Sequence, residues 1–266
     1  MDNRPIGIFD SGVGGLTVAK AIAEELPNEQ LIYFGDTAHL PYGDKSKESV
    51  RAYSNRITGF LLAKGCKAIV IACNTASAHA YSELKKFYPK IPIINVVNPT
   101  VNYCAEKYDQ GKVGVIATKG TIQSRIYPRK IVKKNPNLEV PQNAAPLLVP
   151  MIEEGFFNNN ISQTIINSYL SAKNFEDISA LILGCTHYPL IKGEVERFFQ
   201  GKVDVIDSAS VVAQYTKKIL KKEGIASEHK KGENLFFISD FTESFEETSK
   251  LFFGQKIDLR EERIWD

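Results

Sequence analysis

The chain has 266 residues, of which 43% are hydrophobic and 24% charged, a composition typical of a soluble globular protein with a buried core. Its 33 basic residues nearly balance its 31 acidic ones, and the net charge of +2 argues against a nucleic-acid partner. No apolar run approaches the roughly 18 residues that span a bilayer, and the first residues lack a signal-peptide core. These features exclude a membrane partner and predict a cytoplasmic protein.

Short apolar runs rich in β-branched residues alternate along the chain with longer amphipathic segments. Strands are predicted at residues 5–10, 30–36, 68–73, 91–96, 112–118, 180–185, 202–207 and 234–239. The helices predicted between them include 15–26, 48–65, 162–175 and 210–224. Apolar runs that do not alternate suit strands buried on both faces, so the pattern predicts an α/β fold with parallel sheets covered by helices.

Two parts of the sequence resemble each other. The segment IGIFDSGVGG (6–15) has a counterpart in VGVIATKGTI (113–122), and ACNTA after one strand has a counterpart in GCTHY after another. The spacing from Asp10 to Cys73 is close to that from Thr118 to Cys185. A period this long indicates a duplicated domain, although two unrelated α/β halves could converge on the same pattern. The halves are expected to join near residues 96–101, where a proline follows a strand.

The four cysteines are expected to be reduced thiols, as in most cytoplasmic proteins. They form no C-x-x-C pair, so neither a zinc ribbon nor a thioredoxin-type redox motif is supported. Cys66 and Cys104 are interpreted as inert small hydrophobic residues. Cys73 and Cys185 differ from them, because each stands at the end of a predicted strand.

Ligands of open parallel sheets bind just beyond the carboxyl ends of the strands. The predicted strand ends here are nearly all polar or reactive: Asp10-Ser11, Gly35-Asp36, Cys73-Asn74-Thr75, Ala117-Thr118, Cys185-Thr186-His187 and Asp207-Ser208. Helices are expected to begin at the same positions, with free backbone amides that favour anions. Two such edges facing each other would form a closed cleft with one thiol on each side.

Other chemistries fit the sequence less well. The turn DSGVGG is no dinucleotide fingerprint, because Thr17 stands where the third glycine would fall. Neither cysteine is closely followed by the arginine that a phosphatase loop would use. Cys185 and His187 are only two candidate metal ligands without clear further partners, so no metal is predicted.

Two thiols on opposite faces of a carbon atom can invert it. An unperturbed cysteine has a pKa of about 8.5, which helix amides or a cationic neighbour can lower. A thiolate would remove a proton from one face of the carbon, while a thiol delivers a proton to the other. A nearly symmetric pair of half-sites suits this reaction, because substrate and product are mirror images. The alternative is that each cysteine is a small hydrophobic residue that ends a strand.

Six segments of the chain match sequence motifs of a known enzyme family. They are GIFDSGVGGLTV (7–18), YFGDTAHLPYG (33–43), VIACNTASA (70–78), GTIQS (120–124), VPMIEEG (149–155) and ILGCTHYPL (182–190). With these segments the sequence resembles the glutamate racemases of the cofactor-independent aspartate/glutamate racemase superfamily. The segments span most of the chain and occur in the same order as in that family. Thr186-His187 after the second cysteine is informative, since related aspartate racemases usually have Cys-Thr-Glu there.

The resemblance implies roles for individual residues. Cys73 would act on the α-proton of D-glutamate and Cys185 on that of L-glutamate, with Asp10 near Cys73 and His187 near Cys185 as proton acceptors or orienting groups. The further substrate-binding residues implied are Ser11, Asn74, Thr75 and Thr186 for the ammonium and α-carboxylate, Tyr42 and Gly43 for the side-chain carboxylate, and Thr118, Thr121 and Glu153 lining the cleft. Asp10 could instead cap its turn, His187 could merely begin a helix, and Glu153 could be a solvated carboxylate.

The resemblance also implies two similar, pseudo-symmetric, doubly wound α/β domains with the active site in the cleft between them. The expected division is residues 1–97 with 207–266, and 98–206. The family uses no cofactor and supplies D-glutamate for peptidoglycan, and so for cell shape, in the bacterial cytoplasm. Because the sequence starts shortly before its first strand, without the extension of precursor-activated members, a homodimer without such activation is expected.

Three alternatives remain open at this point. A related racemase could act on aspartate rather than glutamate. An amino-acid-binding module could use the same cleft without chemistry, which would leave the paired cysteines without a purpose. A thiol oxidoreductase would require Cys73 and Cys185 close enough to bridge, whereas racemisation requires a substrate carbon between them.

Overall fold

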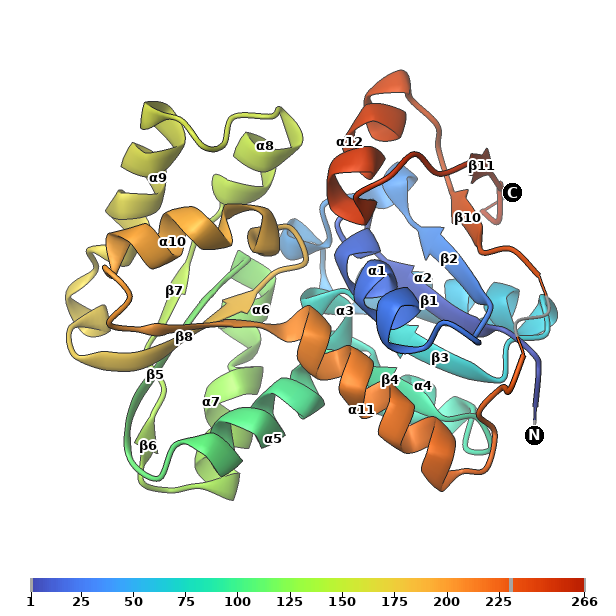
Figure 1. The fold of residues 1–266 in the computed structure, drawn as a ribbon, viewed down its shortest axis with the longest axis horizontal. Coiled ribbons are helices and arrows are strands. Elements are labelled where there is room, and N and C mark those ends of the chain that lie inside the picture. The colour runs from blue at the N-terminus through green and yellow to red at the C-terminus, as the bar shows by residue number, and fades with distance from the viewer. Residues whose placement is uncertain (1, 230–231, 266) are drawn as a thin grey trace. The chain divides into compact units, whose positions relative to one another are not determined.

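The computed structural model describes residues 2–229 and 232–265. The chain divides into two compact units, Met1–Val96 with Ala209–Asp266 (the first unit) and Val97–Ser208 (the second unit). Each unit is built on its own sheet, and every paired strand among the described residues runs parallel to its partner (Figure 1). The predicted α/β class with parallel sheets is therefore confirmed.

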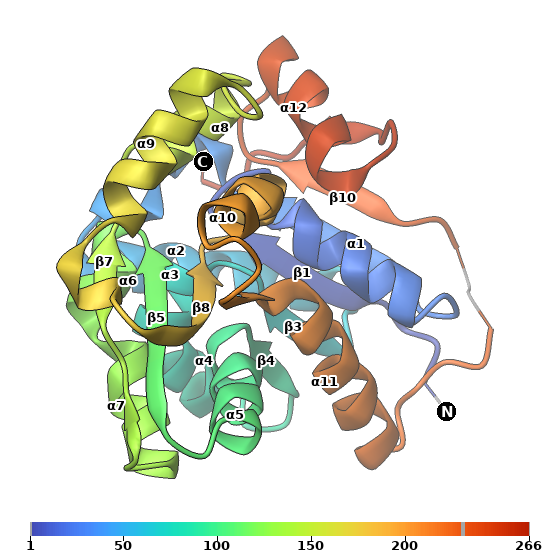
Figure 2. The ribbon, with the colours of Figure 1, turned by 60° about the vertical axis from the view of Figure 1, so that its left-hand side comes forward.

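The sheet of the first unit has the strand order β11-β10-β2-β1-β3-β4 among the described residues. Its strands are β1 (Ile6–Asp10), β2 (Leu31–Gly35), β3 (Ala68–Ile71), β4 (Ile93–Asn95), β10 (Leu235–Ile238) and β11 (Leu259–Glu261). Its helices are α1 (Leu16–Glu25), α2 (Lys47–Ala63), α3 (Asn74–His79), α4 (Tyr81–Phe87), α11 (Ser208–Lys222, starting at the unit boundary) and α12 (Glu243–Phe253). α1 packs against α12 and lies alongside β1, whereas α2 packs against α3 and α4 (Figure 2).

The helix α2 illustrates why this part of the sequence folds as it does. Ser46 caps its start by accepting a hydrogen bond from the Ser49 amide at 3.1 Å. Val50, Ile57 and Leu61 recur at helical spacing and are fully buried in the core beside strands β1, β2 and β3. Burial of each such side chain contributes about 1.5–3 kcal/mol, so this one face suffices to fix the helix on the sheet.

The sheet of the second unit has the order β6-β5-β8-β9, with β7 also paired to β5. Its strands are β5 (Gly111–Ala117), β6 (Leu138–Glu139), β7 (Gln142–Ala144), β8 (Ile178–Gly184) and β9 (Asp204–Asp207). Its helices are α5 (Val97–Lys107), α6 (Lys119–Ser124), α7 (Ile126–Lys134), α8 (Leu148–Glu153), α9 (Asn160–Leu170) and α10 (Lys192–Phe198). Consecutive buried residues in β5 and β8 show that both faces of this sheet are covered.

All eight predicted strands are present, with ends that shift by one or two residues. The short strands β6, β7 and β11 were not predicted, because two or three residues carry no periodic signal. The helix predicted at 162–175 ends at Leu170 and is followed by the 3₁₀ helix η3 (Lys173–Phe175). Pro99 lies in the first turn of α5, where its missing amide breaks no helical hydrogen bond.

No helix within residues 2–229 and 232–265 is both long enough and apolar enough to cross a membrane.

A buried ion pair secures the amino-terminal ends of the strands in the first unit. Lys67 Nζ, just before β3, lies 2.6 Å from Glu29 Oε2, and both side chains are almost fully buried. Lys67 also donates to the Asp2 carbonyl at 2.5 Å and to Ser227 Oγ at 2.8 Å. The Ser227 amide in turn donates to Glu29 Oε1 at 2.8 Å, so the pair and its hydrogen bonds join four segments that are distant in the sequence.

Replacing Lys67 by methionine tests the importance of this pair. Lys67→Met is expected to lower the free energy of unfolding by about 3–5 kcal/mol, because it leaves the Glu29 carboxylate buried without its cation. Urea unfolding followed by circular dichroism measures the change. Lys256→Met is the matched control, since it removes an exposed pair with Glu246 and should cost about 0–1 kcal/mol. Equal losses in both variants would contradict this assignment.

Candidate functional site

Parallel pairing gathers the predicted site residues at one edge of each sheet. In the first unit β1 lies between β2 and β3, so Asp10 at the end of β1 is flanked by the ends of both neighbours. Cys73 follows β3 by two residues. In the second unit β8 pairs with β5, so Cys185 and Thr118 both directly follow neighbouring strands. The predicted placement at carboxyl ends is confirmed within each unit.

Asp10 holds the glycine-rich turn that follows β1. Its Oδ2 accepts hydrogen bonds from the Gly12 amide at 3.3 Å and the Gly15 amide at 3.0 Å. A Cβ atom on Gly15 would lie only 2.4 Å from the Cβ of Asp10, so glycine is required for this close approach. The carboxylate is fully buried, and it caps the turn, as the alternative for this residue proposed.

Cys73 caps the start of α3. Its Sγ accepts from the Ala76 amide at 3.4 Å, and the thiol lies 3.7 Å from Ser11 Oγ, to which it donates. Asn74 and Thr75 form the first turn of the helix and are buried beside the sulfur. The helix amides therefore favour negative charge at this position.

Tyr42 points into the protein rather than outward. Its hydroxyl donates to Asp36 Oδ2 at 2.7 Å, and Ser239 Oγ donates to Asp36 Oδ1 at 2.8 Å. Burial and the nearby Asp36 carboxylate raise the pKa of Tyr42 well above its usual range, so the phenol remains a donor. Gly43 lies in the same 3₁₀ turn, η2 (Tyr42–Asp44), whose geometry Tyr42 anchors.

Asp36 is a functional candidate that the sequence reasoning did not select. It is fully buried at the end of β2, and both of its oxygens lie 3.0 Å from the His39 Nδ1. Its position in the YFGD segment at a strand end was the available signal. Its role as an anchor for Tyr42 and His39 depends on contacts that the sequence does not reveal.

Cys185, His187 and Glu153 form a line of contacts in the second unit. Cys185 Sγ lies 3.8 Å from His187 Nδ1, and His187 Nε2 lies 2.9 Å from Glu153 Oε1. His187 is 5% exposed. The carboxylate comes from the end of α8, whereas the thiol and imidazole follow β8. Glu153 is therefore a partner of His187, although its side chain remains 26% exposed.

The charge of His187 is set by these two contacts. Burial by itself lowers the pKa of His187, but the hydrogen bonds and negative charges of Cys185 and Glu153 outweigh it and raise the pKa to about 10. The imidazole is thus protonated through neutral pH. A cation beside the sulfur stabilises negative charge there when the thiol gives up its proton.

The two cysteines precede helices of different kinds. An α-helix begins directly after Cys73, whereas Cys185 is followed by the 3₁₀ helix η4 (Tyr188–Ile191), and α10 starts only at Lys192. The helix expected after this strand end is therefore a 3₁₀ helix that begins at Tyr188, and no α-helix directly follows Cys185. Pro189 has no amide to offer in the first turn of η4, and the imidazole of His187 takes the place of the helix amides.

Two threonines shape the end of β5. Thr118 caps α6 by accepting from the Thr121 amide at 3.4 Å, and the two hydroxyls are 3.2 Å apart. Thr186 is buried between Cys185 and His187.

The predicted site residues fall into two sets, one in each unit. The first unit holds Asp10, Ser11, Tyr42, Gly43, Cys73, Asn74 and Thr75, and the second holds Thr118, Thr121, Glu153, Cys185, Thr186 and His187.

The remaining cysteines, Cys66 and Cys104, lack the features of reactive thiols. Burial raises the pKa of the Cys66 thiol to about 12, and burial with the Asp204 charge does the same for Cys104. All four cysteines are free thiols. Cys66 and Cys104 therefore remain protonated at neutral pH, as the interpretation of them as inert hydrophobic residues requires.

A metal would need converging ligands. Within the part of the chain that the structure describes, no group of three or more His, Cys, Asp or Glu side chains is arranged to hold a metal ion. Both nitrogens of His187 are engaged, one with Cys185 and one with Glu153, so these side chains form a line rather than a coordination sphere.

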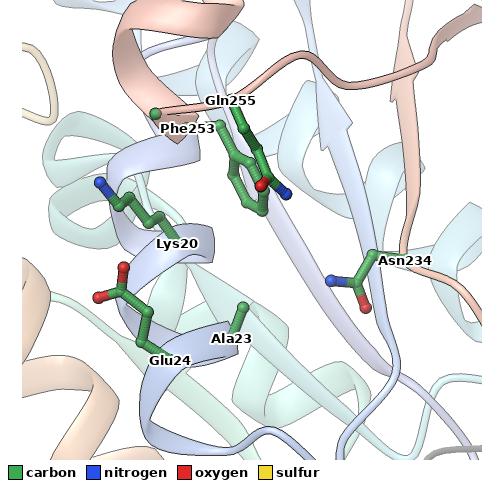
Figure 3. Close-up of a pocket in the computed structure, with 7 residues that line it drawn as sticks. Lys20, Ala23, Glu24, Asn234, Phe253 and Gln255 are labelled. Atoms are coloured by element: carbon green, nitrogen blue, oxygen red, sulfur yellow. The ribbon is translucent and has the colours of Figure 1, made fainter.

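A hollow of about 480 Å³ on the first unit lies apart from the predicted residues. Figure 3 shows Lys20 and Glu24 extending from α1, with Phe253 and Gln255 from the end of α12 nearby. Ala23, Asn234 and Gly254 complete its lining. This lining includes neither a cysteine nor a histidine, so it offers no counterpart to the groups around Cys73 and Cys185.

Comparisons with known proteins give a consistent result. A family model described as Asp/Glu/Hydantoin racemase matches residues 6–216. A glutamate racemase of Geobacter metallireducens is 42% identical over 96% of this chain and 94% of its own length, and one of Aquifex aeolicus is 42% identical over 95% of each. The crystal structure of glutamate racemase from Francisella tularensis in complex with D-glutamate is 39% identical, with a TM-score of 0.93 over 100% of this chain and 99% of that chain. Picrophilus torridus aspartate racemase shares the fold at 22% identity, with a TM-score of 0.58.

The link between Glu153 and His187 can be tested by titration. In Glu153→Gln the pKa of His187 is expected to fall well below about 10, because the charged acceptor at Nε2 is lost while the burial remains. The NMR signals of the imidazole followed against pH measure it. Glu154→Gln, at the exposed adjacent position, is the matched control and should leave the titration unchanged.

The raised pKa of His187 also makes the free energy of unfolding depend on pH. Because the folded pKa lies above the ordinary 6.5, the contribution of His187 to the free energy of unfolding is complete below about pH 6.5 and is lost as the pH rises through about 10. Glu153→Gln should reduce this contribution. An unchanged titration of His187 in the variant would show that Glu153 does not control its charge.

Proposed function

The chain belongs to the Asp/Glu/hydantoin racemase family, and from this premise we propose that it interconverts L- and D-glutamate by proton transfer at the α-carbon. One observation carries the proposal: each unit places one buried thiol at the carboxyl edge of its sheet, beside its own charged or polar partners. The names of the relatives supply glutamate as the substrate. The sequence contains neither a dinucleotide-binding loop nor a phosphatase loop that would favour a different activity.

The proposed mechanism uses the two thiols as alternating acid and base. Cys185 as thiolate removes the α-proton of L-glutamate, and Cys73 as thiol donates its proton to the opposite face of the carbon. D-glutamate leaves, and the enzyme then holds a thiol at Cys185 and a thiolate at Cys73, which is the form that accepts D-glutamate for the reverse reaction. Exchange of protons with solvent restores the first form. No cofactor takes part.

The partners of each thiol are those it contacts within its own unit. At Cys185 the protonated His187 balances the thiolate charge, and Glu153 holds the imidazole by its other nitrogen. At Cys73 the Ala76 amide of α3 donates to the sulfur, and Ser11 accepts from the thiol, while Asp10 holds the turn that carries Ser11. His187 and Asp10 are therefore assigned as orienting groups of their thiols.

Substrate contacts are assigned by the resemblance and restricted by the structure. We assign the ammonium and α-carboxylate to Ser11, Asn74, Thr75 and Thr186, and the lining of the cleft to Thr118 and Thr121. The side-chain carboxylate is assigned to the backbone amides of Tyr42 and Gly43, as the resemblance implies, and the engagement of the Tyr42 hydroxyl by Asp36 supports this assignment.

The wider setting is also proposed. We propose two pseudo-symmetric domains, 1–97 with 207–266 and 98–206, that enclose the substrate, and the two compact units support this division. We further propose a homodimer in the bacterial cytoplasm that supplies D-glutamate for peptidoglycan. Sedimentation equilibrium tests the dimer, and restored growth of depleted cells on added D-glutamate tests the supply role.

The decisive experiment uses the purified chain without added cofactor in D₂O. L-glutamate is expected to become D-glutamate that carries deuterium at the α-carbon, because the donated proton comes from a thiol in exchange with solvent. Chiral chromatography with mass spectrometry measures both changes. L-aspartate is the control substrate and should turn over far more slowly. Glutamate that keeps its configuration and its α-hydrogen would overturn racemisation and favour a binding module.

Replacing either cysteine should nearly abolish turnover. Cys73→Ser and Cys185→Ser are expected to lower kcat by about 10²- to 10⁴-fold, the usual value of a positioned acid or base. Cys66→Ala and Cys104→Ala remove the two buried thiols with raised pKa values and should retain activity. Similar losses in all four folded variants would contradict a specific role for Cys73 and Cys185.

A further inference from the structure

Two fully buried tyrosines have no part in the proton transfers above. Tyr33, in β2, donates its hydroxyl to the Gly12 carbonyl at 2.6 Å. Tyr188, the first residue of η4, donates its hydroxyl to the Ala145 carbonyl at 3.1 Å. One tyrosine lies in each unit, and each bonds a backbone carbonyl of a segment that carries a carboxylate. A buried hydroxyl that holds a loop in this way can control the position of the groups on that loop.

Tyr33 fixes the turn beside Cys73. Asp10 binds the amide of Gly12, and Tyr33 binds the carbonyl of the same residue, so the turn is held from both sides. Space around it is tight: a Cβ on Gly35 would lie 2.4 Å from the Gly12 carbonyl oxygen, and one on Gly15 would lie 2.9 Å from the Tyr33 hydroxyl. Ser11, the hydrogen-bond acceptor of Cys73, precedes Gly12 directly.

Tyr188 fixes the start of α8. The Ala145 carbonyl accepts from both the Tyr188 hydroxyl and the Leu148 amide, the latter at 3.2 Å. The helix α8 begins at Leu148 and ends at Glu153, whose Oε1 meets His187. Because Tyr188 is the neighbour of His187 in the chain, its hydrogen bond ties the imidazole and the helix carrying its carboxylate to one another.

Both hydroxyls remain donors over a wide pH range. Burial raises the pKa of Tyr33 well above its usual value, and the charges of Asp10 and Cys73 raise it further. Burial likewise raises the pKa of Tyr188, with additional contributions from Cys185 and Tyr169. Neither hydroxyl ionises at neutral pH, so each can act as a hydrogen-bond donor that positions its partner but not as a base.

We propose that Tyr33 and Tyr188 are paired positioning residues, one for each thiol. Tyr33 places the turn with Asp10 and Ser11 at Cys73, and Tyr188 places Glu153 on His187 at Cys185. This inference rests on the proposed racemisation by two thiols. Loss of one hydroxyl should therefore slow the proton transfer of its own thiol and leave that of the other nearly unchanged.

The test compares Tyr33→Phe and Tyr188→Phe by isotope effects. Because the enantiomers have equal free energies, kcat/KM falls equally in both directions, and rates alone cannot tell which thiol is affected. The kinetic isotope effect of deuterium at the α-carbon does distinguish the thiols. A raised barrier for proton transfer at one thiol makes cleavage of the C–H bond by that thiol more rate-limiting. Each variant is expected to lose roughly tenfold in kcat/KM, in line with one lost buried hydrogen bond.

The expected isotope effects on kcat/KM are opposite in the two variants. Tyr188→Phe should raise the effect for α-deuterated L-glutamate and lower it for D-glutamate, whereas Tyr33→Phe should do the reverse. Tyr88→Phe is the matched control, since its hydroxyl bonds Asn55 on α2 at 3.0 Å, and it should leave both effects unchanged. Replacement of either tyrosine by 4-aminophenylalanine, which keeps a donor at the end of the ring, should restore the wild-type pattern.

Several outcomes would overturn the pairing. Equal changes of the two isotope effects in both variants, or lower thermal stability with unchanged isotope effects, would reduce the tyrosines to a structural role. If a phenylalanine variant does not fold, the 4-aminophenylalanine variant decides the point, and its failure to show the wild-type pattern overturns the proposal. If the wild-type chain exchanges no α-hydrogen of glutamate, the racemisation itself fails, which is a distinct result.

Discussion

Parallel pairing of the strands is the constraint on which the rest of the structure depends. Because paired strands in each sheet of the described chain run in one direction, their carboxyl ends meet at a single edge. Asp10 and Cys73 are brought together in this way, and so are Thr118 and Cys185. The opposite edge of the first sheet is held by the buried pair of Lys67 with Glu29. Stability and chemistry are thus assigned to different ends of the same strands.

The two half-sites solve one electrostatic problem by different means. In the proposed mechanism each must permit a sulfur atom to become negative in a buried place, where a lone charge is costly. Cys73 receives an amide hydrogen bond from the helix that it caps, and Cys185 lies beside an imidazolium. Helix amides are permanent dipoles, whereas the imidazolium depends on Glu153 and on pH. The proposed reaction between mirror images uses two thiols, and it does not require that they be stabilised alike.

Buried polar groups in these half-sites also restrict how the backbone can move. The turn after β1 is bonded on both sides of Gly12, and Asp36 binds Tyr42 and His39 at the end of β2. Each such bond would leave an unpaired buried group if the segment shifted. A rigid edge of this kind keeps acid and base groups in place without adding residues that touch the substrate.

Local patterns in the sequence determined the strands, the main helices and the positions of both cysteines at strand ends. These features depend on neighbouring residues, since a buried strand is a short apolar run and a surface helix repeats every three to four positions. The segments that resemble the racemase family added an expected substrate and proposed roles for the thiols, which the periodicity alone did not contain.

Only the tertiary structure decided which groups meet. Glu153 reaches His187 across 34 positions of the chain, and Tyr42 turns inward because Asp36 accepts its hydroxyl. The absence of an α-helix directly after Cys185 also results from the fold, where η4 and His187 occupy that place. Hydrogen bonds of this kind join segments that are distant in sequence, and their geometry exists only once the sheets and helices have packed.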